Sequence, residues 1–223
     1  MKIKAVLFDC DGLMFDTENY SHRIWTRIAK EEGVRLPDDF FMMITGAGRK
    51  NTEAYMNSIE GIEKVMPRAR AERFDLDAFR KMEKDALTKP GLVELTKWLQ
   101  AHGYLTAVCS SSNSEYVHTL ISTVSEKLEY DAVVGGDMTT RGKPDPEIFL
   151  LGAKTLGVAP ENCLVLEDSK QGIIAARRAG MHSCFIPDTV KPDAEMEESI
   201  EYRRGSLREV IGLLEEENEY GNE

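Results

Sequence analysis

The sequence predicts an α/β protein whose core is a doubly wound parallel sheet. Short apolar runs recur along the chain, and amphipathic helical patterns separate them. Strands that are apolar without alternation are typical of parallel sheets covered by helices on both faces. One long stretch, residues 17–88, carries only helical patterns. We therefore expect an α/β core with a smaller all-α domain inserted after the first strand.

The expected strands are short and apolar, and they are Ala5–Phe8, Leu105–Cys109, Ala132–Val134, Cys163–Glu167 and Ser183–Ile186. Several of the helices between them have recognisable first turns. One helix is expected to begin after Ser112 or Asn113, both good N-cap residues. Another takes Asp145 as its N-cap and Pro146 as its first residue, and a C-terminal helix starts from Ser206.

This alternation divides the chain into a Rossmann-like catalytic core, residues 1–16 and 89–223, and a helical cap domain, residues 17–88. Asp16 and Thr17 are expected to mark the hinge into the cap. Trp25 and Trp98 lie on apolar helix faces, which indicates a packing role. Residues 187–202 are expected to form a loop or the edge of a lid.

Charge and cysteine content exclude several classes of protein. A formal net charge of −11 argues against a nucleic-acid partner, for which clustered basic residues would be expected. No secretory stretch and no run of membrane-spanning length is present, so we expect a cytoplasmic protein without a membrane partner. The cysteines lack C-x-x-C spacing and are expected to be buried free thiols: Cys10, Cys109, Cys163 and Cys184. A monomer is the default expectation.

Polar side chains follow the ends of the predicted strands or the loops after them: Asp9, Asp11, Ser110, Lys143, Glu167 and Asp168. Ligands bind at the carboxyl ends of the strands in open α/β sheets, so we expect these residues to converge. Four acids together indicate a hard cation with oxygen ligands, and Mg²⁺ fits better than Ca²⁺. A lysine and a serine beside such a cation suit the oxygens of a phosphoryl group.

The motifs themselves resemble those of a known superfamily. "DCDGLMFDT" (residues 9–17), Ser110, "GKPDPEIF" (residues 142–149) and "LEDSKQGIIAARRAG" (residues 166–180) together are similar to the haloacid dehalogenase superfamily. The helical insert resembles the cap of its β-phosphoglucomutase-like branch. The resemblance extends over nearly the whole chain, in order and in spacing.

The resemblance implies a role for each residue that matches a motif. Asp9 would be the nucleophile that forms an aspartyl-phosphate. Asp11 would protonate the leaving oxygen and then act as the base that activates water. Ser110 would donate to a phosphate oxygen, with help from backbone N–H groups around Asp11 and Ser111.

The resemblance also implies a metal centre. Mg²⁺ would be held by the Asp9 carboxylate, the Asp11 backbone carbonyl and Asp168. Glu167 would bind it through water or support the site from outside. The cation and Lys143 would offset the repulsion between an anionic nucleophile and a phosphate dianion.

Plainer interpretations exist for the same residues. Asp9 and Asp11 could be a helix cap and a turn acid after a strand, and Lys143 could be a surface lysine. Arg49 and Lys50, in "TGAGRKNTEAY", are candidates to reach the substrate, although a solvated basic pair would read the same. The histidines have no metal-like spacing and are expected to be structural or exposed: His22, His102, His118 and His182.

The expected function is a magnesium-dependent phosphatase acting on a small phosphorylated metabolite, most simply a sugar phosphate. A β-phosphoglucomutase-type mutase is the main alternative, weakened because Ser21 stands where those enzymes have a cap histidine, with His22 next. Asp11 disfavours phosphonate cleavage, despite the position of Lys50, and also disfavours a dehalogenase. The intact set of motif residues argues against a non-catalytic phosphate-binding or regulatory protein.

Overall fold

The computed structural model describes residues 3–44 and 49–220, apart from the side chains of residues 49–51 and 218–220. Within them, six strands form one parallel sheet in the order β3-β2-β1-β4-β5-β6. These strands are β1 (Ala5–Phe8), β2 (Leu105–Cys109), β3 (Ala132–Val134), β4 (Cys163–Glu167), β5 (His182–Phe185) and β6 (Tyr202–Arg203). The predicted fold class is confirmed.

The first four strands have the bounds that the sequence predicts, and the last two differ. β5 runs over His182–Phe185, one residue earlier than the predicted Ser183–Ile186. Its register explains the shift, because His182 is paired with Leu164 of β4. β6 was not predicted, since it has only two residues and lies in a polar segment.

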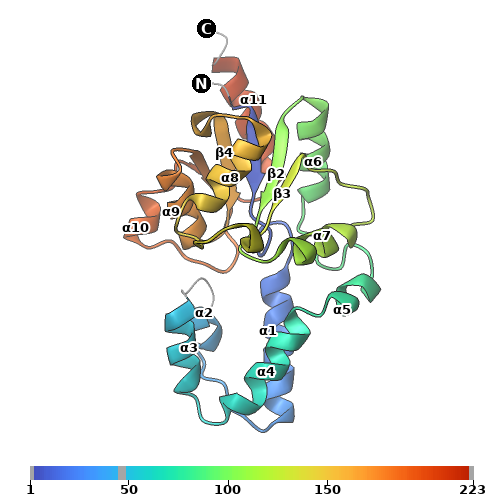
Figure 1. Cartoon of the computed structure of the whole chain (residues 1–223), viewed down its shortest axis with the longest axis vertical. Coiled ribbons are helices and arrows are strands. Elements are labelled where there is room, and N and C mark those ends of the chain that lie inside the picture. The colour runs from blue at the N-terminus through green and yellow to red at the C-terminus, as the bar shows by residue number, and fades with distance from the viewer. Residues whose placement is uncertain (1–2, 45–48, 221–223) are drawn as a thin grey trace.

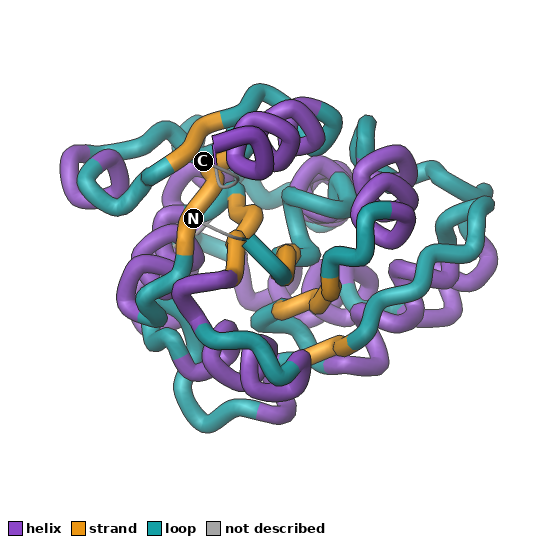
Figure 2. Tube along the Cα trace, turned by 90° about the horizontal axis from the view of Figure 1, so that it is seen from above, coloured by secondary structure: helices purple, strands orange, loops and turns teal. Residues whose placement is uncertain are grey.

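Helices cover both faces of the sheet (Figure 2). In β1, Val6 and Phe8 belong to one hydrophobic cluster, and Ala5 and Leu7 belong to another. Alternate side chains of the strand therefore point to opposite faces of the sheet and pack into two separate cores. The first core includes α6 (Leu92–Ala101), α7 (Ser114–Ser122) and α11 (Glu209–Tyr220), and the second includes α8 (Glu147–Leu156) and α9 (Lys170–Arg178).

Two helices begin later than predicted, because polar side chains hold the preceding turn. α8 starts at Glu147 with Pro146 at the N-cap, and the Asp145 carboxylate accepts a hydrogen bond from the Glu147 N–H at 3.0 Å. α11 starts at Glu209 rather than Ser206. There the Glu209 carboxylate folds back and accepts a hydrogen bond from the Ser206 hydroxyl at 3.1 Å. α7 starts at Ser114 with Asn113 as its N-cap, as predicted.

The remaining helices are short, apart from those of the inserted segment. They are α10 (Ala194–Glu197) and the 3₁₀ helices η1 (Gly136–Met138) and η2 (Pro160–Asn162). α10 falls within residues 187–202, for which the sequence predicts only a loop or lid edge. The Asp193 side chain caps it by accepting a hydrogen bond from the Met196 N–H at 3.0 Å.

The inserted segment is helical, and most of it lies apart from the sheet, beyond the carboxyl ends of the strands (Figure 1). Its helices are α1 (Thr17–Glu31), α2 (Phe40–Ile44), α3 (Arg49–Asn57), α4 (Ile62–Arg73) and α5 (Leu76–Lys81). α1 to α4 share a hydrophobic core of their own, which includes Trp25, Ile28, Phe40 and Val65. The packing role predicted for Trp25 is confirmed, since the residue is buried against Phe40.

The end of the inserted segment packs on the α/β core instead. Phe79 of α5 and Leu87 belong to the same cluster as β1, and the Phe79 ring lies edge-on to that of Tyr116, with 5.6 Å between centroids. The division into 1–16 plus 89–223 and 17–88 remains our proposal. Packing indicates that the body of the cap is α1 to α4, so the name "cap" below refers to residues 17–73.

Two predictions about burial can be compared with the structure. All four cysteines are buried and free, as the sequence predicts. Trp98 is partly buried and packs against the core cluster that contains β1. Among the described residues, no helix is long and apolar enough to cross a membrane.

Candidate active site

The site begins where β1 ends. The Asp9 N–H still donates to the Leu166 carbonyl of β4 at 3.0 Å, which extends the sheet pairing by one residue. The chain then turns through Gly12, whose φ of +81° favours glycine. This turn places Asp9 at the carboxyl edge of the sheet, next to the residues that end β4. The predicted convergence of strand-end residues is therefore present in the geometry.

Lys143 is a buried cation between two carboxylates. Its Nζ lies 2.5 Å from Asp9 Oδ1 and 2.6 Å from Glu167 Oε1, and its side chain is 5% exposed. The ammonium also lies 4.7 Å from the centre of the Phe149 ring. Burial alone lowers the pKa of Lys143, but Asp9 and Glu167 outweigh it, so the pKa of this ammonium is raised. A surface lysine is excluded, and Lys143 is charged.

Glu167 is completely buried and bound through both oxygens. Its Oε2 accepts hydrogen bonds from the Ser169 N–H and the Ser169 hydroxyl, both at 2.8 Å. A Cβ on Gly172 of α9 would lie only 1.6 Å from Glu167 Oε1, so only glycine leaves room for this carboxylate. Glu167 is therefore fixed, with its Oε1 held against Lys143.

Asp168 is the carboxylate that lacks a partner. Each of Asp9, Glu167 and Asp168 offers an oxygen within 4.8 Å of the others, and all three residues are buried. Asp168 accepts no hydrogen bond from any residue that the structure describes. A Cβ on Gly12 would lie 2.3 Å from Asp168 Oδ2, so the glycine keeps space open there. Buried carboxylates with a single lysine between them suit a divalent cation with oxygen ligands.

Burial has the same effect on both acids at this edge. It raises the pKa of Asp9, with Glu167 and Asp11 adding to the effect and Lys143 opposing it. Burial also raises the pKa of Asp168, and the neighbouring Glu167 and Asp9 raise it further. A bound cation would favour the ionised form of both carboxylates.

The Asp11 carboxylate faces hydroxyl groups and lies outside the group of three acids. Oδ1 accepts hydrogen bonds from the Thr17 hydroxyl at 2.8 Å and the Tyr116 hydroxyl at 2.9 Å. Oδ2 accepts one from the Ser112 hydroxyl at 2.9 Å and a longer one from Ser110 at 3.4 Å. The two acids of the first motif thus have different surroundings.

The serines after β2 do not all contribute alike. Ser110 is buried, and its hydroxyl accepts a hydrogen bond from the Ser112 N–H at 3.0 Å while it donates weakly to Asp11. Ser111 is exposed, and its hydroxyl has no hydrogen-bond partner among the described residues. Ser112 was expected only as a possible helix N-cap, and yet its hydroxyl makes a shorter contact with Asp11 than that of Ser110 does.

Two charged cap residues lie close to this site, and the sequence interpretation missed them. Arg73, at the end of α4, donates through Nη2 to Glu18 Oε1 of α1 at 3.1 Å. The Nε of Arg73 is buried without a hydrogen-bond partner among the described residues. Asp11 contributes to raising the pKa of both Glu18 and Arg73, so this pair lies near the first motif. Nothing in their local sequence marks either residue.

A cavity of about 470 Å³ lies between the cap and the core. Its lining comes from both sides and consists of His22, Phe41, Met42, Thr189, Val190 and Lys191. The His22 ring stacks on Phe41, with 3.9 Å between ring centres, and its Nε2 is buried without a described partner. His22 was expected to be structural or exposed, but it lines this cavity. Arg49 and Lys50 begin α3, and their side chains lie outside the described part of the chain.

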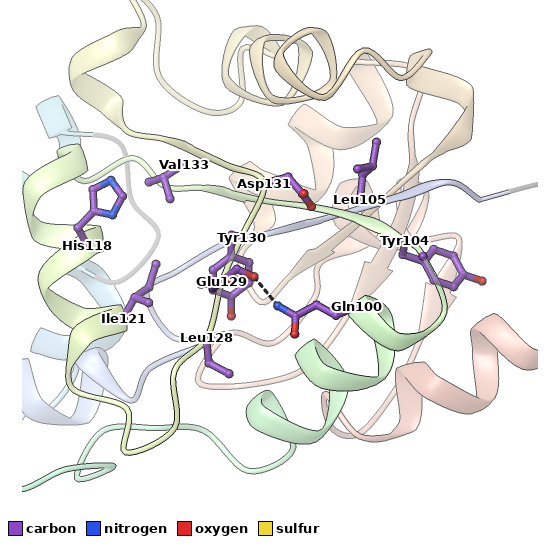
Figure 3. A pocket seen from close by; sticks show the side chains of 11 residues that line it. Gln100, Tyr104, Leu105, His118, Ile121, Leu128, Glu129, Tyr130, Asp131 and Val133 are labelled. Atoms are coloured by element: carbon purple, nitrogen blue, oxygen red, sulfur yellow. Dashed lines mark hydrogen bonds between the residues drawn. The ribbon is translucent and has the colours of Figure 1, made fainter.

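A larger hollow lies elsewhere (Figure 3). Leu105, the first residue of β2, and Asp131, just before β3, contribute to it. These are the amino ends of parallel strands, opposite to Asp9. Gln100 points toward Glu129 and donates to its carbonyl at 2.8 Å (Figure 3). The hollow contains none of the converging residues, so we do not assign it to the active site.

Fold and site together define a capped α/β protein, with an acidic strand edge beside a buried lysine. The chain belongs to the haloacid dehalogenase-like hydrolase family, whose family model matches residues 3–180. The predicted resemblance is thereby confirmed.

Individual relatives agree with this assignment. The chain is 33% identical to the fructose-1-phosphate phosphatase YqaB of Escherichia coli, over 82% of this chain and 95% of that protein. It is 35% identical to a CBBY-like protein of Arabidopsis thaliana over 82% of this chain, but it spans only 62% of that relative's length. The structure of β-phosphoglucomutase from Clostridium difficile shares the fold, with a TM-score of 0.73 and 24% identity, over 99% of this chain and 100% of that one.

Proposed function

We propose that this chain is a magnesium-dependent phosphatase that hydrolyses the phosphate ester of a small sugar through an aspartyl-phosphate on Asp9. The observation that carries the proposal is the contrast between the two motif acids. Asp9 lies against Lys143 and the two acids that end β4, whereas Asp11 lies among hydroxyls. The cationic and metal-binding surroundings of Asp9 suit a nucleophile. The hydroxyl groups around Asp11 suit a residue that donates and accepts a proton.

The proposed reaction has two steps. In the first, an Asp9 oxygen forms a bond to phosphorus while the bond from phosphorus to the sugar oxygen breaks, and Asp11 gives its proton to that oxygen. In the second, Asp11 takes a proton from water as the water oxygen attacks the aspartyl-phosphate and releases phosphate. Lys143 offsets the negative charge at the point of attack. Mg²⁺ bound by Asp9, Asp168, the Asp11 carbonyl and Glu167, directly or through water, would neutralise the phosphoryl oxygens.

The cavity between the cap and the core supports a substrate with a polar organic part. Its lining combines the aromatic residues His22 and Phe41 with Thr189 and Lys191, so it includes both apolar and polar residues. The named activity of the Escherichia coli relative, on fructose 1-phosphate, favours a phosphorylated sugar. We further propose that the cap closes over this substrate and limits the access of water.

The test is a phosphate-release assay on a panel of sugar phosphates and an aryl phosphate, with Mg²⁺ or with chelator. Asp9→Asn and Asp11→Asn run alongside the unaltered protein. We expect Mg²⁺-dependent release that Asp9→Asn abolishes. Asp11→Asn should instead slow turnover and accumulate phosphoenzyme from the aryl phosphate, whose leaving group needs little protonation. Intact-mass measurement detects the added phosphoryl group.

Other outcomes point elsewhere. Release that persists in Asp9→Asn would contradict the proposed nucleophile. Isomerisation of β-glucose 1-phosphate once a bisphosphate is added, without net hydrolysis, would favour the mutase alternative. No turnover of any substrate would favour a phosphate-binding protein.

A further inference from the structure

Asp188 is a carboxylate beside the candidate metal site that the roles assigned above do not use. It lies in the loop after β5, within the segment whose role the sequence left open, and its side chain is only 10% exposed. Its Oδ1 lies 2.6 Å from the Lys89 ammonium. Its Oδ2 is buried and has no hydrogen-bond partner among the described residues. Such an oxygen has lost water without gaining a donor, which is unfavourable if nothing else binds it.

The unpartnered oxygen faces the acidic cluster. A Cβ on Gly12 would lie 3.4 Å from Asp188 Oδ2 and 2.3 Å from Asp168 Oδ2, so the two carboxylates border the same small space. Asp188 is also one of the charges that raise the pKa of Asp168. The two acids therefore face each other across the gap that only glycine leaves open at position 12.

Asp188 does not belong to the group of acids that could bind one metal ion directly. Asp9, Glu167 and Asp168 are the described acids whose oxygens all lie within 4.8 Å of one another, and Asp188 is not in that group. It is therefore not placed to share one ion directly with all three. An oxygen outside this group can instead accept hydrogen bonds from water on the ion, as carboxylates around metal sites commonly do.

Lys89 makes this arrangement electrostatically possible. A further free carboxylate beside three others would repel them, but Asp188 is already paired with an ammonium. It adds a hydrogen-bond acceptor near the cation with little added net charge. Lys89 is itself fixed, because its N–H donates to the Met14 carbonyl at 3.0 Å, in the turn that follows the first motif.

We propose that Asp188 is a positioning residue of the metal centre, in which Lys89 holds Oδ1 and Oδ2 accepts hydrogen bonds from water on the divalent cation. This inference rests on the divalent-cation site of the proposed function. Asp188 thereby ties the loop after β5, which also lines the cavity through Thr189 and Val190, to the ion at the end of β1. Through its ion pair with Lys89, Asp188 also connects this loop to the segment in which the chain returns from the inserted helices to the core.

The experiment measures metal binding directly, without substrate or turnover. Mn²⁺ is titrated into the purified protein and followed by calorimetry and by the signal of free Mn²⁺ in electron paramagnetic resonance. Asp188→Asn keeps the shape but lowers the charge and the acceptor strength. Asp193→Asn is the matched control, because Asp193 makes the same kind of ion pair, with Lys170 at 2.6 Å, five residues along the same segment. Unfolding in chelator shows whether each variant is folded.

We expect Asp188→Asn to weaken Mn²⁺ binding by about 10-fold or more, and Asp193→Asn to leave it unchanged. Lys89→Met should shift it by a smaller factor, because Asp188 loses its anchor but keeps a charge that is then unpaired beside the ion. Unchanged affinity in both Asp188→Asn and Lys89→Met would overturn the inference and leave the proposed function intact. If the unaltered protein binds no Mn²⁺, the metal site of the proposed function fails, and this inference fails with it. If Asp188→Asn does not fold, the Lys89→Met result decides alone.

Discussion

The phenolic oxygen of Tyr116 lies 2.9 Å from Oδ1 of Asp11, although the two residues are 105 positions apart in the chain. The Tyr116 ring is held at the first turn of α7 by contacts with Phe74 and Phe79 from the segment around α5. The hydroxyl that reaches Asp11 is thus positioned by elements on both sides of the active site.

Tyr116→Phe should keep the ring contacts and remove one hydrogen bond to Asp11. We expect the free energy of unfolding to fall by about 1–2 kcal/mol, since a hydrogen bond to a charged group is lost. We expect kcat to fall by about 10-fold, because Asp11 loses part of what orients it. Tyr130→Phe is the control, since among the described residues the Tyr130 hydroxyl hydrogen-bonds Thr96 and not Asp11. The Tyr130→Phe variant should lose some stability and keep its kcat. If kcat of Tyr116→Phe equals kcat of Tyr130→Phe, the proposed role of Tyr116 is contradicted.

Lys143→Met should remove the buried charge between Asp9 and Glu167 at nearly constant volume. We expect kcat/KM for phosphate release to fall by about 100- to 1,000-fold, the usual loss when a donor that stabilises developing charge is removed. Lys154→Met, on the exposed side of α8, should leave turnover unchanged. Steady-state kinetics at saturating Mg²⁺ would check both variants. A Lys143→Met enzyme with near-normal kcat/KM would mean that the lysine serves folding alone.

Gly172→Ala tests the space that α9 leaves for Glu167. Alanine in a helix interior ordinarily gains about 0.5–1 kcal/mol over glycine. Here the new Cβ would lie 1.6 Å from Glu167 Oε1, so the carboxylate must move away from Lys143. We expect a net loss of about 1–3 kcal/mol in the free energy of unfolding, together with weaker Mn²⁺ binding. Gly212→Ala in α11 meets nothing within 4 Å and should be neutral or stabilising by the same denaturant measurement.

His22 makes the stability of the fold depend on pH. Burial, with the nearby Arg73 adding to it, lowers the pKa of His22 below its ordinary value of 6.5, although Asp188 and Asp16 oppose this. As pH falls through 6.5, the unfolded chain binds the proton first, so this residue makes the fold less stable on the acid side. His22→Phe, which can still stack on Phe41, should flatten the fall in unfolding free energy between about pH 7 and pH 5.

Denaturant unfolding at several pH values would measure this slope. His118→Gln is the control, because His118 is exposed on α7. An unchanged slope in His22→Phe would mean that other groups set the acid-side stability.

Strand-end chemistry is the part of the site that the sequence could predict. Asp9, Lys143 and Asp168 each follow a strand or the loop after it, and parallel topology alone brings such positions to one edge. The pattern also separates the helical insert from the core, because no strand signal occurs within it. β6 escaped prediction because its two residues carry no periodicity, and only pairing with β5 defines it.

The remaining site residues depend on tertiary packing. Tyr116 reaches Asp11 only because of the rotation of α7 about its axis, and Arg73 lies near the motif only because α4 ends there. Asp188 lies in a loop whose path the sequence pattern does not specify. Side chains of these kinds occur throughout any protein surface. Burial distinguishes them, together with the unpaired atoms of Arg73 and Asp188, and both are properties of the folded chain.

The hydroxyls around Asp11 also bear on how its proton can move. Thr17, Ser110, Ser112 and Tyr116 each carry a hydrogen that swings about a single C–O bond, and each oxygen can accept as well as donate. When Asp11 changes between carboxylate and carboxylic acid, these groups can reverse their roles by rotation alone. No heavy atom has to shift and no backbone has to adjust. The proposed acid and base steps can therefore alternate within one rigid frame, and the time for each proton transfer need not include a rearrangement of the site.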